Sequence, residues 1–179
     1  ELKGHDDLFA AAPELIRRIP NIRFLFVGDG PWRERFETLA AAPGLSGRFR
    51  FAGLVPPSAI PSQVALMDCL VHLSRREGLP RALPQALAGG RPVVAFDCDG
   101  AGEICRDGET GFLLAPGDLQ GLVDRLARLA GDAGLRDRMG AVGRAWVSER
   151  FTTRRLVDDQ HALYLRLARH LQTPAFPAA

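Results

Sequence analysis

The sequence contains few cysteines and no apolar run long enough to cross a membrane. The three cysteines are irregularly spaced and form neither a C-x-x-C pair nor a zinc-type cluster with histidine: Cys69, Cys98 and Cys105. The apolar runs stay below the roughly 20 residues of a membrane-spanning helix, and the first residues lack the basic-then-apolar pattern of a signal peptide. These absences favour reduced thiols, no metal site and a cytoplasmic location, with peripheral membrane contact of the whole protein left open.

Net charge is also nearly absent. Lys and Arg total 23 against 21 for Asp and Glu, and the resulting net charge of +2 gives no strong field to attract nucleic acid. Apolar residues, by contrast, make up 46% of the 179 residues, which is enough for the core of one domain. The chain lacks an initiator Met and enters a helical pattern within a few residues, so we expect it to be a fragment of a longer protein.

Strand-like and helix-like segments alternate along the chain. Residues 5–18 place apolar side chains at helical spacing, and IRFLFVGDG, RFRFAG, DCLVHLS and RPVVAFD have the apolar, β-rich character of buried strands. A turn-rich passage with one short strand then leads to an apolar helical stripe at residues 119–129 and two further helices. This alternation predicts an α/β fold: a Rossmann-like open parallel sheet with helices on both faces, ending in C-terminal helices.

Open parallel sheets bind ligands beyond the carboxyl ends of their strands. The loops there are GDGPW, GLVPP, SRREGLPR and DCDGAGE. The first is not a dinucleotide fingerprint, because Arg33 stands where a third glycine is required; Gly28 and Gly30 fit either a ligand contact or a tight turn. Glu77 fits either a helix cap or a ligand-binding acid beside a helix N-terminus. Glu103 fits either a solvated loop acid or a ligand contact.

Five segments carry recognisable motifs in a fixed order. LKGHDDLFAAAPEL contains K-G-x-x-x-L, FLFVGDGPWRERFETLA contains G-x-G-P, and RFRFAGLV is a strand followed by a turn. SRREGLPRALPQALAGGRPVVA aligns with an E-x7-E segment, and GAGEICRDGETGFLLAPGD with G-G-x-x-E and D-G-x-x-G-x-L segments. In this order they resemble the C-terminal, donor-binding half of a GT-B glycosyltransferase of the retaining group called family 4 or group 1. The resemblance covers nearly the whole chain.

The resemblance implies roles for individual residues. Lys3 matches the lysine that binds the donor diphosphate, and Glu77 matches the acid that reaches the donor sugar and supports the positive charge of the transition state. Arg81 and Ala82 match backbone contacts to the diphosphate. The remaining matched positions include the turn that meets the nucleobase, residues 53–55; they are Gly28, Gly53, Leu54, Val55, Gly78 and Leu79.

Two positions depart from the family pattern. Gln85 replaces the second acid of E-x7-E, which binds the donor ribose in relatives; an amide still offers donors and an acceptor to ribose hydroxyls. Glu103 matches the acid of G-G-x-x-E, although Ala101 separates the two glycines of this loop. The arginine that accompanies the diphosphate-binding lysine in the family would lie before Glu1.

The implied activity is transfer of a sugar from a nucleotide diphosphate sugar to an acceptor, with retention of configuration and without a cofactor or metal. Residues 1–171 are expected to form the donor-binding domain and residues 172–179 a frayed tail. The acceptor domain, which would receive a glycan, lipid or small molecule, and the first strand of the sheet would precede Glu1, so the isolated chain is expected to be nearly inactive. Two alternatives stay open: a non-hydrolysing UDP-sugar epimerase and a non-catalytic nucleotide-sugar-binding module.

Overall fold

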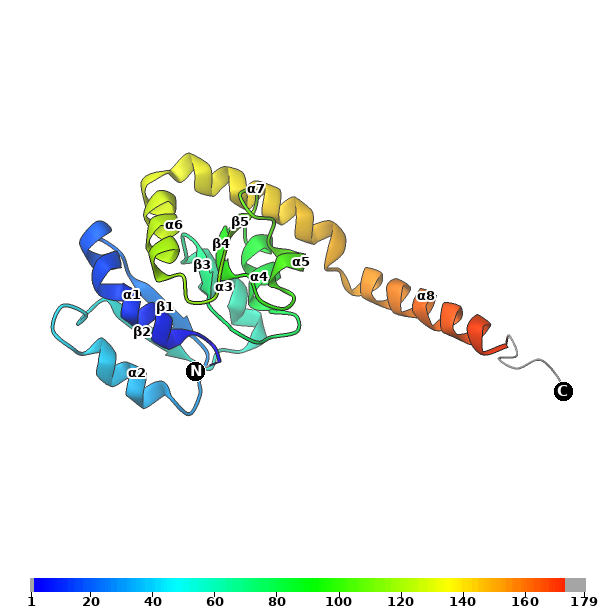
Figure 1. Ribbon diagram of the computed structural model, residues 1–179, viewed down its shortest axis with the longest axis horizontal. Coiled ribbons are helices and arrows are strands. Elements are labelled where there is room, and N and C mark those ends of the chain that lie inside the picture. Colours follow the sequence, from blue (N-terminus) through cyan, green and yellow to red (C-terminus); the bar gives the residue numbers. More distant parts are fainter. Residues whose placement is uncertain (1, 173–179) are drawn as a thin grey trace.

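Strands and helices alternate along the chain, as the sequence predicts. The structure, a computed structural model, describes the backbone of residues 2–172 and the side chains of residues 2–169. The elements shown in Figure 1 are, in order, α1 His5–Arg18, β1 Phe24–Val27, α2 Arg33–Ala40, β2 Phe49–Gly53, the short 3₁₀ helix η1 Pro57–Ala59, α3 Ile60–Ala65, β3 Leu70–His72, α4 Ala82–Ala88, β4 Val93–Phe96, α5 Ala101–Ile104, β5 Gly111–Leu114, α6 Leu119–Gly131, α7 Ala133–Arg150 and α8 Thr153–Gln172. The expected frayed tail lies outside the described residues from position 173 onward.

All strand pairs in the described residues are parallel, which confirms the α/β class. They form two sheets, β1-β2 and β3-β4-β5, where the sequence predicts one open sheet. Phe24 of β1 aligns with Phe49 of β2, and Val93 of β4 aligns with Leu70 of β3 and Gly111 of β5. A groove lined by residues of both strands lies between β1 and β3.

The buried strand β4 is covered by helices on both faces. Val94 and Phe96 belong to the core cluster that contains residues of α1 and α6, whereas Val93 and Ala95 belong to the cluster of α4 and α5. Successive side chains of a strand point to opposite faces, so a strand between two helical layers must be apolar throughout. The continuous run PVVAF satisfies this requirement, and residues 93–96 are all 0% exposed.

Aromatic side chains fill the smaller sheet and its contact with α1. The ring of Phe49 stacks on Phe9 of α1 at 4.7 Å and on Phe24 of β1 at 4.6 Å between centroids. Phe26 and Phe51 form a third stacked pair at 5.0 Å. Such rings bury large areas in a thin layer, which allows a two-stranded sheet to have a core.

Helices α6 and α7 begin at acidic caps. Asp118 accepts a hydrogen bond from the Gly121 N–H at the start of α6, and Asp132 accepts one from the Leu135 N–H at the start of α7, both at 2.8 Å. The apolar stripe predicted for α6 is buried at Leu122, Val123, Leu126 and Leu129. Figure 1 shows α8 continuing beyond α7 and extending away from the body of the molecule.

Gly4, at the N-terminus of α1, fits a position that other residues cannot occupy without strain. Its φ is +68°, and an added Cβ would lie 2.1 Å from the Leu73 carbonyl oxygen. The start of α1 is therefore pressed against the backbone that follows β3. This contact places Lys3 at the carboxyl end of the three-stranded sheet.

Candidate functional site

Lys3 and Glu77 meet at the carboxyl end of β3. The Lys3 Nζ lies 2.7 Å from the Glu77 Oε2, although the two residues are 74 positions apart in sequence. The Glu77 side chain is 27% exposed and the Lys3 side chain 57% exposed, so the pair remains open to a ligand. The structure thus brings together the two residues that the resemblance assigns to the diphosphate and the sugar.

The alternative role of Glu77 as a helix cap is wrong. The helix α4 begins at Ala82 with Arg81 as its N-cap, and that end has no side-chain cap bond within the described part of the chain. Glu77 points instead to Lys3. Its carboxylate therefore does not cap α4.

Opposing effects set the pKa of Glu77. Burial alone would raise the pKa of this carboxyl, but the hydrogen bond and charge of Lys3, with smaller contributions from His72 and Ser74, outweigh it and hold the pKa below its ordinary value. The group is therefore an anion at neutral pH. An anion at this place can accept hydrogen bonds from hydroxyls and stabilise nearby positive charge.

His72 is a neighbour of Glu77 that sequence reasoning did not identify as part of the site. Its Nε2 is 3.3 Å from the Glu77 Oε2, yet this buried nitrogen has no hydrogen bond of good geometry among the described residues. Burial lowers the pKa of His72 more than the Glu77 charge raises it, and Lys3 lowers it further. The imidazole is neutral at pH 7. Its position as the last residue of β3 was the available signal.

Asp99 is a second residue that sequence reasoning missed. Its Oδ2 accepts a hydrogen bond of 2.6 Å from the backbone N–H of Glu77, and its own φ is +48°. The next residue, Gly100, lies so close to Gly78 that an added Cβ would be 2.1 Å from the Gly78 carbonyl oxygen. The loop after β4 therefore supports the loop that carries Glu77. An aspartate directly before a glycine in a strand-end loop was the sequence signal.

The first residues of the chain are fixed to the same loop. The carbonyl of Leu2 accepts hydrogen bonds from the Arg75 N–H at 2.8 Å and from the Ser74 hydroxyl at 3.2 Å. The Arg75 guanidinium donates to the carboxylate of Asp7 at 2.9 Å. These bonds hold the backbone on both sides of Lys3, which positions its ammonium group beside Glu77.

The glycines that end β1 and β2 also lie together. The Gly28 N–H donates to the Gly53 carbonyl at 2.9 Å, and both residues have positive φ values, +122° and +69°. The side chain of Leu54, directly after this turn, is 81% exposed. Residues 53–55 therefore form a turn at the carboxyl end of the smaller sheet, with Gly28 hydrogen-bonded beside it. Gly28 also lines the adjacent groove.

The remaining predicted residues surround this region. Gln85, on α4, lines the same groove as Lys3 and His72, whereas Glu103 is exposed on α5. Leu79 and Arg81 are exposed in the segment that leads into α4. Their roles stay predictions.

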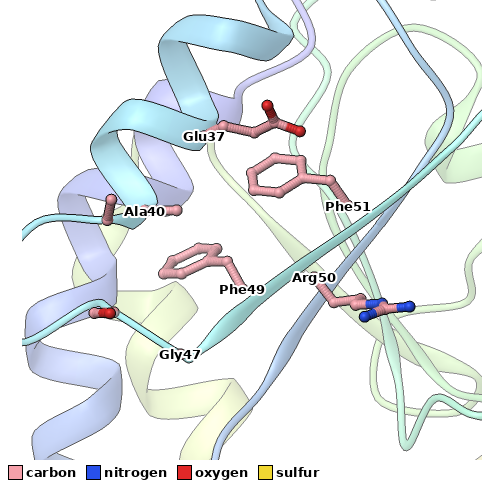
Figure 2. Close-up of a pocket in the computed structure, with 8 residues that line it drawn as sticks. Glu37, Ala40, Gly47, Phe49, Arg50 and Phe51 are labelled. Atoms are coloured by element: carbon pink, nitrogen blue, oxygen red, sulfur yellow. The ribbon is translucent and has the colours of Figure 1, made fainter.

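A separate pocket of about 410 Å³ lies at the outer edge of β2. Figure 2 shows Glu37 and Ala40 of α2 facing the rings of Phe49 and Phe51, while the side chain of Arg50 points to the other side of the strand. None of the predicted site residues lines this pocket. It is formed by the aromatic packing of β2 against α2 and does not belong to the Lys3–Glu77 site.

The described residues contain neither a metal-type cluster nor a membrane span. They hold no group of three or more His, Cys, Asp or Glu side chains able to bind a metal ion. Within residues 2–172, no helix combines the length and apolar character that crossing a bilayer requires. The three cysteines are free thiols.

The chain is similar to known proteins over most of its length. Residues 1–146 match the model of the family described as glycosyl transferases group 1. An alpha-D-kanosaminyltransferase of Streptomyces kanamyceticus is 36% identical over 137 residues, which are 76% of this chain and 36% of that protein. A GDP-mannose-dependent alpha-(1-6)-phosphatidylinositol monomannoside mannosyltransferase of Mycolicibacterium smegmatis is 31% identical over 159 residues, 85% of this chain and 42% of that protein.

Solved structures agree with the sequence relatives. HepE of Anabaena in complex with UDP-glucose superposes with a TM-score of 0.80 at 27% identity, over 92% of this chain and 45% of that chain. The chain thus spans less than half the length of each of these proteins. It belongs to the group 1 glycosyltransferases and has the α/β architecture of a GT-B fold.

Proposed function

We propose that the chain is the donor-binding half of a retaining glycosyltransferase that transfers a sugar from a nucleotide diphosphate sugar to an acceptor. The observation that carries the proposal is the Lys3–Glu77 pair at the carboxyl end of β3, a cation for a diphosphate beside an anion for a sugar. Family membership supports the reaction class. A relative named as GDP-mannose-dependent and a similar structure holding UDP-glucose support a nucleotide-sugar donor.

In this proposal Lys3 binds the diphosphate of the donor and Glu77 binds its sugar. Lys3 supplies a compact, mobile positive charge to the diphosphate, assisted by backbone N–H groups of Arg81 and Ala82. Glu77, held as an anion, accepts hydrogen bonds from the sugar and stabilises the positive charge that develops at the anomeric carbon. The free ion pair keeps each side chain near its place before the donor arrives.

The other predicted residues contact the nucleoside and the flanks of the donor. Residues 53–55 and Gly28 form the turn for the nucleobase, and Gln85 binds the ribose hydroxyls through its amide. Glu103 contacts the sugar or phosphate from α5. Gly78 and Leu79 offer backbone to the donor where the chain passes from Glu77 to α4.

The reaction exchanges one bond at the anomeric carbon for another. The bond from that carbon to the diphosphate oxygen breaks, and a bond to the acceptor oxygen forms on the same face of the sugar. The acceptor hydroxyl loses a proton, which the leaving nucleoside diphosphate takes up. Lys3 and the backbone N–H groups neutralise the leaving group, so the proposal requires no metal ion. The acceptor is a glycan, lipid or small molecule bound by a further domain.

Donor binding tests the division of roles in this chain. UDP, UDP-glucose, GDP-mannose and ADP-glucose are titrated while the backbone amide resonances are followed. Lys3→Ala should weaken binding of the nucleotide and the nucleotide sugar alike, by about tenfold, because it removes a charged hydrogen bond to the diphosphate. Glu77→Gln should weaken the nucleotide sugar more than the free nucleotide.

The matched control is Arg17→Ala, which removes an exposed ion pair with Glu14 on the outer surface of α1 and should leave all affinities unchanged. If none of the four ligands shifts a resonance near Lys3 or Glu77, the donor-site proposal is wrong.

Catalysis is tested in the full-length protein. Glu77→Gln should reduce sugar transfer by about 10²-fold or more, since it removes charge stabilisation in the transition state. Wild-type protein is also incubated with labelled UDP-sugar in the absence of an acceptor. Inversion at C2 of the sugar would identify an epimerase, and unchanged transfer by Glu77→Gln would contradict the catalytic role.

A further inference from the structure

The imidazole of His72 presents a buried nitrogen that has no hydrogen-bond partner among the described residues. This Nε2 lies 3.3 Å from the Glu77 Oε2, close to the length of an N–H···O hydrogen bond but without its geometry. The His72 side chain is only 15% exposed, so water does not readily replace the missing partner. A buried polar atom left without a partner is costly, and its position beside the acid of the site suggests a role other than packing.

The charge of Glu77 decides which ring nitrogen of His72 carries the proton. Burial lowers the pKa of His72 and keeps the ring neutral, so one nitrogen is an N–H and the other is bare. A bare Nε2 would direct its lone pair at the ionised carboxylate of Glu77 and be repelled, whereas an Nε2–H is attracted to it. His72 therefore directs a hydrogen-bond donor toward Glu77.

The Glu77 carboxylate thus has two neighbouring donors, which differ in mobility. The Lys3 Nζ, 2.7 Å from the Glu77 Oε2, is at the end of a long side chain that is 57% exposed. His72, by contrast, is the last residue of β3 and aligns with Ala95 of the completely buried strand β4. The ammonium group of Lys3 can follow a ligand, whereas the imidazole is fixed to the sheet.

A donor diphosphate competes with Glu77 for Lys3. In the proposed function Lys3 binds the diphosphate, whose negative charge exceeds that of one carboxylate. As the Lys3 Nζ moves toward the diphosphate, its bond to Glu77 weakens at the moment when Glu77 must be held beside the sugar. To reach the length of an ordinary hydrogen bond, the Glu77 Oε2 and the His72 Nε2 need to approach each other by only about 0.4 Å.

We propose that His72 is a positioning residue for Glu77: its Nε2–H takes over the carboxylate when Lys3 turns to the diphosphate and holds it beside the donor sugar. This inference rests on the proposed function and adds a residue to it. No proton is transferred, since it stays on the His72 Nε2. Glu77 remains an anion and stabilises the positive charge at the anomeric carbon.

The first test reproduces the departure of Lys3 without any ligand. Lys3→Met keeps a long side chain but removes its charge. In this variant the His72 Nε2–H should exchange with water about tenfold more slowly than in wild type, measured on the imidazole signal in ¹H–¹⁵N spectra, because it is now bonded to Glu77. The double variant Lys3→Met/Glu77→Ala should lose this protection. Exchange that is equal in all three proteins would overturn the inference.

The second test measures sugar transfer by the full-length protein, with whichever of UDP-glucose, GDP-mannose and ADP-glucose it uses. His72→Leu should lower kcat by about tenfold and change the KM for the donor by less than about twofold, because it affects the placement of Glu77 and not donor binding. His72→Gln, whose amide N–H can replace the Nε2–H, should keep kcat within about threefold of wild type. The matched control is His5→Gln, whose ring packs on Phe26 and Phe36 and whose replacement should leave kcat unchanged.

The possible failures can be told apart. Unchanged kcat in His72→Leu, together with a large loss in Glu77→Gln, would overturn the role of His72 and leave the proposed function intact. Equal losses in His72→Leu and His72→Gln would assign His72 to packing and also overturn its role. Unchanged transfer by Glu77→Gln would contradict the proposed function itself. The exchange measurement replaces neither His72 nor the ligand, so it decides the inference even if His72→Leu does not fold.

Discussion

The two sheets of this protein differ in how completely their strands are buried. The three-stranded sheet has a completely buried central strand, β4, and aliphatic packing on both faces. The two-stranded sheet is only partly covered, with Phe24 and Gly53 as its buried residues, and depends on stacked aromatic rings. The three-stranded sheet, called the deep sheet from here on, carries the loops of Glu77 and Asp99. The two-stranded sheet, called the shallow sheet, carries the glycines Gly28 and Gly53 at its carboxyl end.

This difference separates two mechanical requirements. The acid proposed to act on the reacting sugar needs a fixed position, and the buried sheet supplies it because close-packed interiors resist displacement. The turn proposed to meet the nucleobase lies on a sheet with an open edge and exposed strands, which has fewer buried contacts to hold it. The shallow sheet should therefore unfold first when the molecule is destabilised.

The largest expected effect comes from removing a ring in the deep sheet. Phe96→Ala in β4 should lower the free energy of unfolding by about 3–5 kcal/mol, because it leaves a cavity at a fully buried site. Phe51→Ala in β2, where the ring is partly exposed, should lower it by about half as much. Urea unfolding followed by circular dichroism measures both. Equal losses for the two variants would show that the sheets contribute alike.

A smaller effect is expected where the start of α1 meets the deep sheet. Gly4→Ala should lower the free energy of unfolding by about 3 kcal/mol, because the new Cβ meets the Leu73 carbonyl and φ is positive. The control is Gly44→Ala, at φ +84° with open space around the Cβ, which should lose only about 1 kcal/mol. Comparing the two variants in the same urea titrations separates the cost of the steric clash at Gly4 from the cost of a positive φ. A loss at Gly4 no greater than that at Gly44 would mean that α1 shifts freely.

The next prediction concerns pH and His72. Burial holds the pKa of His72 below its ordinary value of 6.5, so the unfolded chain binds the proton more tightly and stability is lost as pH falls below 6.5. His72→Gln should reduce this loss by an amount on the order of 1 kcal/mol at most. Unfolding at about pH 7.5 and about pH 5.5 measures it. His5, whose pKa burial also lowers, contributes with the same sign, and His5→Gln is the comparison variant. A steeper pH dependence in His72→Gln would contradict the assignment.

The smallest effect belongs to the Lys3–Glu77 pair. The pKa of Glu77 lies below its ordinary value of 4.5, so the pair stabilises the fold above pH 4.5 and this contribution disappears as pH falls through the folded pKa. Because Lys3 is largely exposed, Glu77→Gln should cost less than about 1 kcal/mol at neutral pH. The difference from wild type should shrink below pH 4.5 in the same denaturation assay. A difference that grows in acid would assign the effect to another group.

Local patterns in the sequence predicted the elements well but not their pairing. The helix at residues 5–18 and the buried strand at Val93 to Phe96 follow from spacing and from continuous apolar character. The division into two sheets could not be predicted in this way, because a strand pattern identifies a strand and not the partner of each edge. The groove between β1 and β3 is lined by residues that lie far apart in the sequence, so no local pattern indicates it.

The candidate site was predictable only in part, for a similar reason. Lys3 and Glu77 were found through motif order, and the structure brings them to 2.7 Å. Asp99 was missed because it acts through a tertiary contact, with a backbone N–H 22 residues away in the sequence. His72 lies only five residues before Glu77, but no motif marks it, and its contact with Glu77 depends on how the loop after β3 folds back.

The contact of Gly100 with Gly78 couples the motions of two loops. Their backbones touch without an intervening side chain, and Asp99 holds the N–H of Glu77 beside them. Displacing the loop after β4 therefore displaces the loop after β3, so the two behave as one rigid body. The entropic cost of arranging the two loops is therefore met when the chain folds, and a molecule that contacts one loop finds the other already in place.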